Sequence, residues 1–207
     1  GDTPFVSKAF FNSLFLNSFM LIATLAVMFY IGFNLNMFGQ DAEVLFYARE
    51  YYIILVWSFI PMVIFNSIRF FSEGIGNTKY AMWITLFSNG LNIFLNWVLI
   101  YGKLGAPQMG VTGGAWATFI SRIVAAVLFF ILLFKVEEYN KYFKFISGKI
   151  ISLKMVKEQL RLSIPISLQS TLEVTAFSLA AIMVGWLGKY ELAAHQVAQS
   201  LSTFTFL

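Results

Sequence analysis

The chain has 207 residues, of which 59% are hydrophobic and 12% are charged, whereas a soluble domain carries about 25% charged residues. This composition and a mean hydropathy of +0.76 exclude a soluble protein and indicate an integral membrane protein. The net charge of +4 predicts no nucleic-acid partner because the excess lies beside apolar segments, and the absence of cysteine excludes disulfides, thiolate catalysis and cysteine-based metal sites.

Long apolar runs predict an all-α, polytopic helical bundle. Residues 1–4 are expected to form a loop, and no signal peptide is predicted. The first five predicted helices have 20 or more residues each, enough to cross about 30 Å of hydrocarbon. The sixth runs to Leu207 without a flanking charge, so we expect the chain to be a piece of a longer protein. The predicted helices are 10–32, 48–71, 79–101, 114–135, 162–187 and 191–207.

The basic residues predict the orientation of these helices, because cytoplasmic loops are enriched in lysine and arginine. The segment 135–161 holds half of the 14 basic residues and is therefore expected inside, together with the start of the chain and the 69–79 turn. Its apolar residues between 150 and 160 favour a short amphipathic helix on the inner membrane surface. The basic residues of the segment are Lys135, Lys141, Lys144, Lys149, Lys154, Lys157 and Arg161.

The third predicted helix carries a stripe of polar residues. Thr85, Asn89, Asn92 and Asn96 are spaced four, three and four residues apart, which places them on one helix face. Buried asparagine and threonine often hydrogen-bond between membrane helices, so packing is one interpretation. Lining of a polar cavity is the other, because three asparagines on one face exceed the usual needs of packing.

Glu173 is the only charged residue inside the segment 162–188. It lies about 18 Å along its helix from Arg161, and a carboxylate in hydrocarbon is expected to face the bundle interior or a water-filled cavity. Helical spacing places Gln169 and Ser170 one turn before it and Phe177 one turn after it. The carboxylate could exchange a proton or bind Na⁺ with oxygen ligands from its neighbours, and a protonated group used for packing is the alternative.

Two prolines and the single histidine of the chain allow further predictions. Pro61 and Pro165 lack a backbone N–H, so each is expected to kink its helix, and Pro165 could break it. His195, near the start of the last predicted helix, is expected to be a hydrogen-bonded structural group, because no second histidine, cysteine or carboxylate cluster completes a metal site. No nucleophile with a matching base is visible either, so neither a metal site nor an enzyme is predicted.

Several short motifs, present in the same order along the whole chain, resemble the multidrug and toxic compound extrusion (MATE) family. Each motif is weak alone, but the ordered set is specific. The motifs are 73–79, 92–96, 101–102, 107–110, 113–118, Pro165, 172–177 and 191–196.

The resemblance implies a transporter of twelve helices in two lobes around a central cleft. This chain would span the third through seventh helices and the start of the eighth. Residues 1–135 would form the C-terminal part of the first lobe with four helices, 136–161 the basic cytoplasmic linker between lobes, and 162–207 the start of the second lobe. The acidic residue of the first lobe lies on the family's first helix, outside the region matched here.

The resemblance also implies an antiporter working by alternating access in the cytoplasmic membrane. It would export cationic amphipathic drugs or toxic organic compounds while Na⁺ or H⁺ enters, with no cofactor and no obligate protein partner. A flippase for lipid-linked oligosaccharides is the alternative, but its cavity should hold several basic residues for a pyrophosphate, and the helix interiors here offer little beyond Arg122.

Site residues follow from the same resemblance. Glu173 matches the acid of the seventh helix that is implicated in cation coupling. Asn92 and Asn96 match polar positions of the fifth helix that line the first lobe's cavity. The other candidates for cavity lining and substrate binding are Asn89, Gln169, Ser170, Phe177 and His195.

Overall fold

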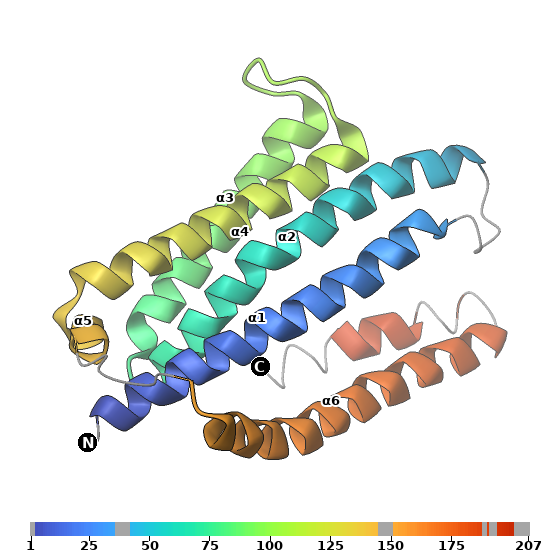
Figure 1. Ribbon diagram of the computed structural model, residues 1–207. Coiled ribbons are helices and arrows are strands. Elements are labelled where there is room, and N and C mark those ends of the chain that lie inside the picture. The colour runs from blue at the N-terminus through green and yellow to red at the C-terminus, as the bar shows by residue number, and fades with distance from the viewer. Residues whose placement is uncertain (1–2, 36–41, 145–150, 188–189, 191–193, 201–207) are drawn as a thin grey trace. The chain divides into compact units, whose positions relative to one another are not determined.

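The computed structural model describes residues 3–35, 42–144, 151–187, 190 and 194–200 (Figure 1). The described residues form helices and turns and contain no strand, which confirms the all-α prediction. Four of the helices are long and apolar enough to cross a membrane: α1, α2 from Ala48 onward, α3 and α4. The helices are α1 (Thr3–Phe33), α2 (Ala42–Gly74), α3 (Thr78–Tyr101), α4 (Gly110–Lys135), α5 (Glu137–Lys144) and α6 (Leu153–Leu187).

The predicted end of α3 is accurate, whereas the predicted start of α1 is wrong. α3 ends at Tyr101 as predicted, because Gly102 takes a left-handed conformation (φ 66°, ψ 40°) and its N–H bonds to the Val98 carbonyl. α1 begins at Thr3 rather than at residue 10, since Pro4 is tolerated in a first helical turn. The expected loop at residues 1–4 is therefore wrong for Thr3 and Pro4.

The connection before the fifth predicted span also differs from the prediction. Residues 153–160 are the first turns of α6 and not a separate amphipathic helix, while α5 is a short helix that directly follows α4. α2 and α6 continue across Pro61 and Pro165, so the expected break at Pro165 is wrong. Of the last predicted helix, 191–207, residues 194–200 are helical and the rest lies outside the described residues. The predicted span 162–187 lies within α6 and stays a prediction.

The chain divides into two compact units, Gly1–Val156 and Lys157–Leu207. The change of unit falls inside the predicted linker 136–161. The assignment of the units to two lobes of a longer transporter stays a prediction.

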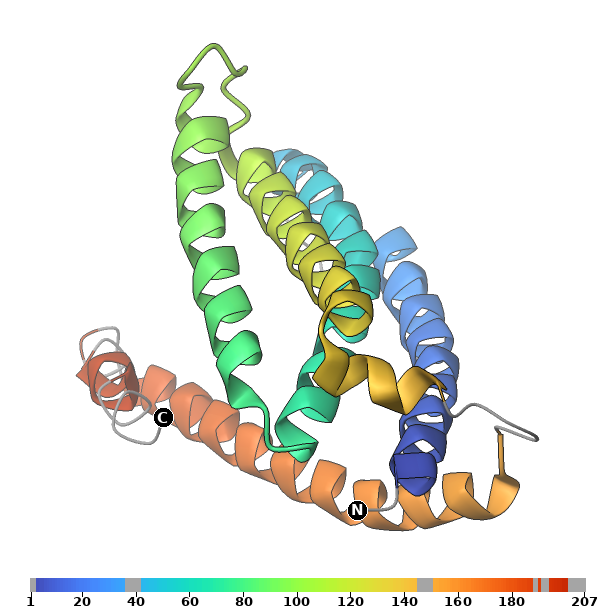
Figure 2. The ribbon, with the colours of Figure 1, turned by 90° about the vertical axis from the view of Figure 1, so that its left-hand side faces the viewer.

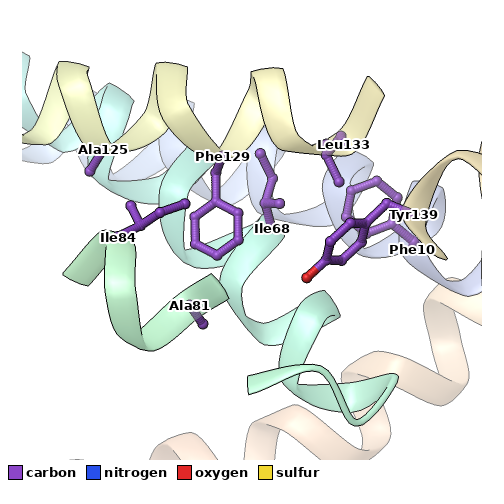
Figure 3. Close-up of a cluster of buried hydrophobic side chains, with 8 residues drawn as sticks. All are labelled: Phe10, Ile68, Ala81, Ile84, Ala125, Phe129, Leu133 and Tyr139. Atoms are coloured by element: carbon purple, nitrogen blue, oxygen red, sulfur yellow. The ribbon is translucent and has the colours of Figure 1, made fainter. Parts of the chain in front are cut away.

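The core of the first unit is a cluster of apolar side chains from α1 to α5 (Figure 3). Phe129 of α4 is fully buried at its centre and contacts Phe65 of α2 with ring centroids 5.4 Å apart. α4 can approach α2 and α3 closely because small side chains cover its buried face, as is common between membrane helices. These small residues are Gly113, Ala115, Ala117, Ser121, Ala125 and Ala126.

Helix α5 ties the ends of three longer helices together, extending from the end of α4 toward α1 (Figure 2). Tyr139 of α5 is fully buried, and its hydroxyl lies 2.5 Å from Ser72 Oγ of α2. Ser72 donates its own proton to the Asn77 carbonyl at 2.5 Å, so Tyr139 is the donor of the pair. On the other side, Ser7 of α1 donates to the backbone carbonyl of Tyr142 at 2.5 Å.

Tyr139 predicts a loss of stability in alkaline solution. Burial, with smaller contributions from Glu138 and Tyr80, raises the pKa of Tyr139 above its ordinary value despite the hydrogen bond with Ser72. Above about pH 10 the unfolded chain ionises this phenol while the folded chain keeps its proton, so the free energy of unfolding falls as pH rises. Tyr139→Phe should remove that part of the pH dependence and cost about 0.5–1.5 kcal/mol at neutral pH.

Thermal unfolding of both proteins in detergent, at about pH 8 and about pH 10.5, measures the difference. Tyr101→Phe is the control, because Tyr101 is exposed and does not contribute to the pKa of Tyr139. Equal losses of stability in wild type and Tyr139→Phe between the two pH values would contradict the prediction.

Candidate functional site

The candidate residues of α6 lie on one uninterrupted helix, Leu153–Leu187. Gln169, Ser170, Glu173 and Phe177 share a face of it, and all four are exposed in the structure. Nearby hydroxyls are occupied by their own helix, since Thr171 donates to the Ser167 carbonyl at 2.8 Å. Among the described residues no lysine or arginine forms an ion pair with Glu173, so its carboxylate is available for a proton or a metal cation.

A polar hollow of about 360 Å³ lies beside this face, within the second unit. Phe177 is the one sequence-predicted residue that lines it; Gln169, Ser170 and Glu173 do not. His195 lies in the helical segment 194–200, and its buried Nε2 has no hydrogen-bond partner in the part of the chain that the structure describes. The lining residues are Phe177, Ser178, Ala181, Gln196, Gln199 and Ser200.

The polar residues of this hollow were not predicted from the sequence. Gln196, Gln199 and Ser200 have the i, i+3, i+4 spacing of one helix face, which was the available signal. Ser178, which lines the same hollow from α6, has no comparable polar pattern around it, because it lies in an apolar part of the sequence.

The polar stripe of α3, which comprises Thr85, Asn89, Asn92 and Asn96, has two different environments in the structure. Asn96 Nδ2 donates to Asn92 Oδ1 at 3.0 Å, and Asn92 Nδ2 donates across to Ser121 Oγ of α4 at 3.3 Å. Thr118 Oγ1 of α4 accepts a weaker contact from the same amide at 3.5 Å. These residues are half-buried and used in helix packing, which is one of the two interpretations of the sequence. A role in lining a transport cavity stays a prediction.

The other part of the stripe faces a cavity. Thr85 and Asn89 line a space of about 250 Å³ between α2, α3 and α4. Arg122 of α4 lies in the same lining and donates from Nη1 to Ser58 Oγ of α2 at 2.6 Å. In the sequence Arg122 stands out as an isolated interior charge, but nothing there predicts that it shares a cavity with Asn89.

The structure therefore brings Thr85, Asn89 and Arg122 together in the first unit and places Phe177 beside residues 194–200 in the second. Glu173 and the asparagines belong to different units, and their combination in one transport pathway stays a prediction.

Comparison with known proteins identifies similar chains. The MatE family model matches residues 5–98, which include α1, α2 and most of α3. The whole chain is 30% identical to the "Probable multidrug resistance protein NorM" of Halalkalibacterium halodurans and covers 44% of that protein. It is also 30% identical over 198 residues to the "Multidrug resistance protein NorM" of Vibrio cholerae, which is 95% of this chain and 43% of the relative. The chain thus spans less than half the length of these relatives.

Proposed function

Since the chain belongs to the MatE family, we propose that it is part of a multidrug efflux transporter that exchanges cationic amphipathic compounds for Na⁺ or H⁺. The observation that carries the proposal is similarity along the full chain to proteins named for multidrug resistance. The chain is a multi-pass membrane protein. We place it in the cytoplasmic membrane, working by alternating access between its two faces.

Glu173 is the proposed site of ion coupling. A carboxylate in a membrane helix marks an ion or proton pathway by default, because its cost in hydrocarbon is otherwise uncompensated. Its helix also presents Gln169 and Ser170 on the same face, and their oxygens can complete a Na⁺ site or hydrogen-bond a protonated carboxyl. Loading of the carboxylate with H⁺ or Na⁺ would remove its charge and weaken its attraction for a cationic drug, so ion and drug would alternate.

Aromatic and polar side chains support the proposed cationic amphipathic substrates. Phe177 supplies an aromatic face at the polar hollow of the second unit, and such faces attract organic cations. Gln196 and Gln199 supply polar groups at the same hollow.

Transport in vesicles tests the proposal. The full-length protein, reconstituted into liposomes, should move ethidium against an imposed Na⁺ gradient at fixed pH, or against a pH gradient without Na⁺. Dissipation of the productive gradient should stop the movement, and protein-free liposomes are the control. Absence of ethidium movement under both gradients, with protein shown to be folded and inserted, would contradict the proposed function.

A further inference from the structure

Arg122 occupies a position where an arginine is costly. It lies near the middle of α4, about 18 Å along the helix from Gly110, and α4 is one of the helices long enough to span a membrane. Charged residues at that depth are rare and usually mark a ligand or ion site. None of the described residues forms a salt bridge with Arg122; the ion pair in this part of the chain joins Arg69 and Glu73.

The one hydrogen bond that Arg122 makes within the described residues leaves most of its donors unused. Nη1 donates to Ser58 Oγ at 2.6 Å, and the Ser58 hydroxyl in turn donates a hydrogen bond to the Leu55 carbonyl at 2.7 Å. A guanidinium has five N–H groups in a planar fork, so the remaining ones can still bind an acceptor. The cavity of about 250 Å³ lies directly beside this fork.

Two asparagine amides add further donors to the same cavity. Asn66 of α2 and Asn89 of α3 both line it, and neither side chain hydrogen-bonds within the described residues. The lining residues that the structure describes include no aspartate or glutamate. The polar part of the cavity thus offers one cation and two amide N–H₂ groups, which together select an anion.

Thr85 and Ser88 of α3 also line the cavity, but their hydroxyls donate to backbone carbonyls, and the rest of the described lining is apolar. Met62 and Phe65 of α2 and Ala125 of α4 form the other walls of the cavity. The volume is slightly below the roughly 300–1,000 Å³ typical of sites for drug-sized ligands. A site of this size holds a small molecule or one end of a larger one, with its charged group at Arg122 and its apolar group against Phe65.

We propose that this cavity binds the carboxylate end of a small amphipathic organic anion or zwitterion. The guanidinium of Arg122 pairs with the carboxylate, Asn66 and Asn89 donate to its oxygens, and Phe65 contacts the apolar part. A planar guanidinium matches a carboxylate in two parallel hydrogen bonds, which a single ammonium does not. This proposal goes beyond the proposed export of cations. It does not depend on that function, because it is tested by measuring binding and not transport.

Equilibrium dialysis with three probes of one shape tests the site. The full-length protein in detergent is mixed with 1-naphthoate, neutral 1-naphthamide or cationic 1-naphthylmethylammonium. The wild type should bind 1-naphthoate roughly tenfold or more tightly than 1-naphthamide, as a charge-assisted contact predicts. Arg122→Gln should remove this preference and leave the affinity for 1-naphthamide unchanged.

Arg69→Gln is the matched control, because Arg69 lies in the same unit but outside the cavity. It should keep the wild-type preference, and Arg122→Lys should keep part of it. If Arg122→Gln fails to fold, Asn89→Asp provides the test: Asn89 is exposed at the cavity, and a carboxylate there should abolish binding of 1-naphthoate.

Three results would overturn the proposal. The first is equal affinity of the wild type for 1-naphthoate and 1-naphthamide. The second is unchanged binding of 1-naphthoate in folded Arg122→Gln or, where that variant does not fold, in Asn89→Asp. The third is displacement of 1-naphthoate by inorganic phosphate at equal concentration, which would assign the site to inorganic oxyanions rather than to organic carboxylates.

Discussion

Glu173→Gln in the full-length protein is expected to abolish ion-coupled drug efflux while expression remains normal. Glutamine keeps the size and the hydrogen-bonding capacity of glutamate but neither ionises nor supplies a charge for Na⁺. Because Glu173 is exposed in the structure and forms no ion pair with the described residues, its replacement should not disturb packing. We expect efflux driven by a Na⁺ or pH gradient to fall at least about tenfold, measured as ethidium transport and as drug resistance of cells.

Glu158→Gln is the matched control for this prediction. Glu158 lies on the same helix, α6, but in its first turns, within the segment predicted to be cytoplasmic. It should leave efflux unchanged. Wild-type drug resistance in cells that carry Glu173→Gln at normal protein levels would show that Glu173 does not couple ions to transport.

Gly113→Ala adds only one methyl group but is expected to destabilise the first unit strongly. A Cβ at this position would lie 2.7 Å from the Leu99 carbonyl oxygen and 2.8 Å from its carbon, so the backbones of α3 and α4 would have to separate. Overpacking of this kind typically costs about 1–3 kcal/mol. The same carbonyl accepts a hydrogen bond from the Met109 N–H at 2.9 Å, which the displacement would strain.

Gly90→Ala is the same chemical change, but it is expected to raise the stability of the first unit. Gly90 lies within α3, and nothing surrounds the position of its added Cβ within 4 Å. Alanine should therefore stabilise the helix by about 0.5–1 kcal/mol. Thermal unfolding in detergent measures both variants, and an unfolding temperature of Gly113→Ala at or above that of the wild type would contradict the close approach of α3 and α4.

Hydrophobicity was enough to predict the membrane class, the all-α fold and the approximate positions of α1, α2, α3 and α4, but not the short polar helix α5. The errors at the starts of α1 and α6 have one physical cause. Their first turns contain polar or charged residues, such as Lys8 and Lys154, which a search for apolar runs assigns to loops. A helix needs an apolar face only where it meets lipid or protein, so its polar ends are invisible to this criterion.

The candidate sites were predictable to different degrees. Glu173 and Arg122 are conspicuous because charges are rare in apolar helices, and spacing alone places Gln169 and Ser170 beside Glu173. The surroundings of Arg122 were not predictable, since its hydrogen-bond partner Ser58 and its cavity neighbour Asn66 lie on another helix whose rotation depends on packing. For the same reason, sequence could not decide that Asn92 bonds to Ser121 while Asn89 faces a cavity.

The attachment of α1 has a consequence for the order of assembly during synthesis. Ser7 bonds to the Tyr142 carbonyl, and the Asn12 side chain accepts a hydrogen bond from the Ser152 N–H at 2.8 Å. At about 5–20 residues per second, the ribosome makes these partners roughly 7–30 s after the start of α1. Until then these side chains have only partners within α1, such as the Thr3 and Lys8 carbonyls, while three more helices are inserted. A chaperone or insertase that shields α1 during this interval would favour correct assembly of the bundle.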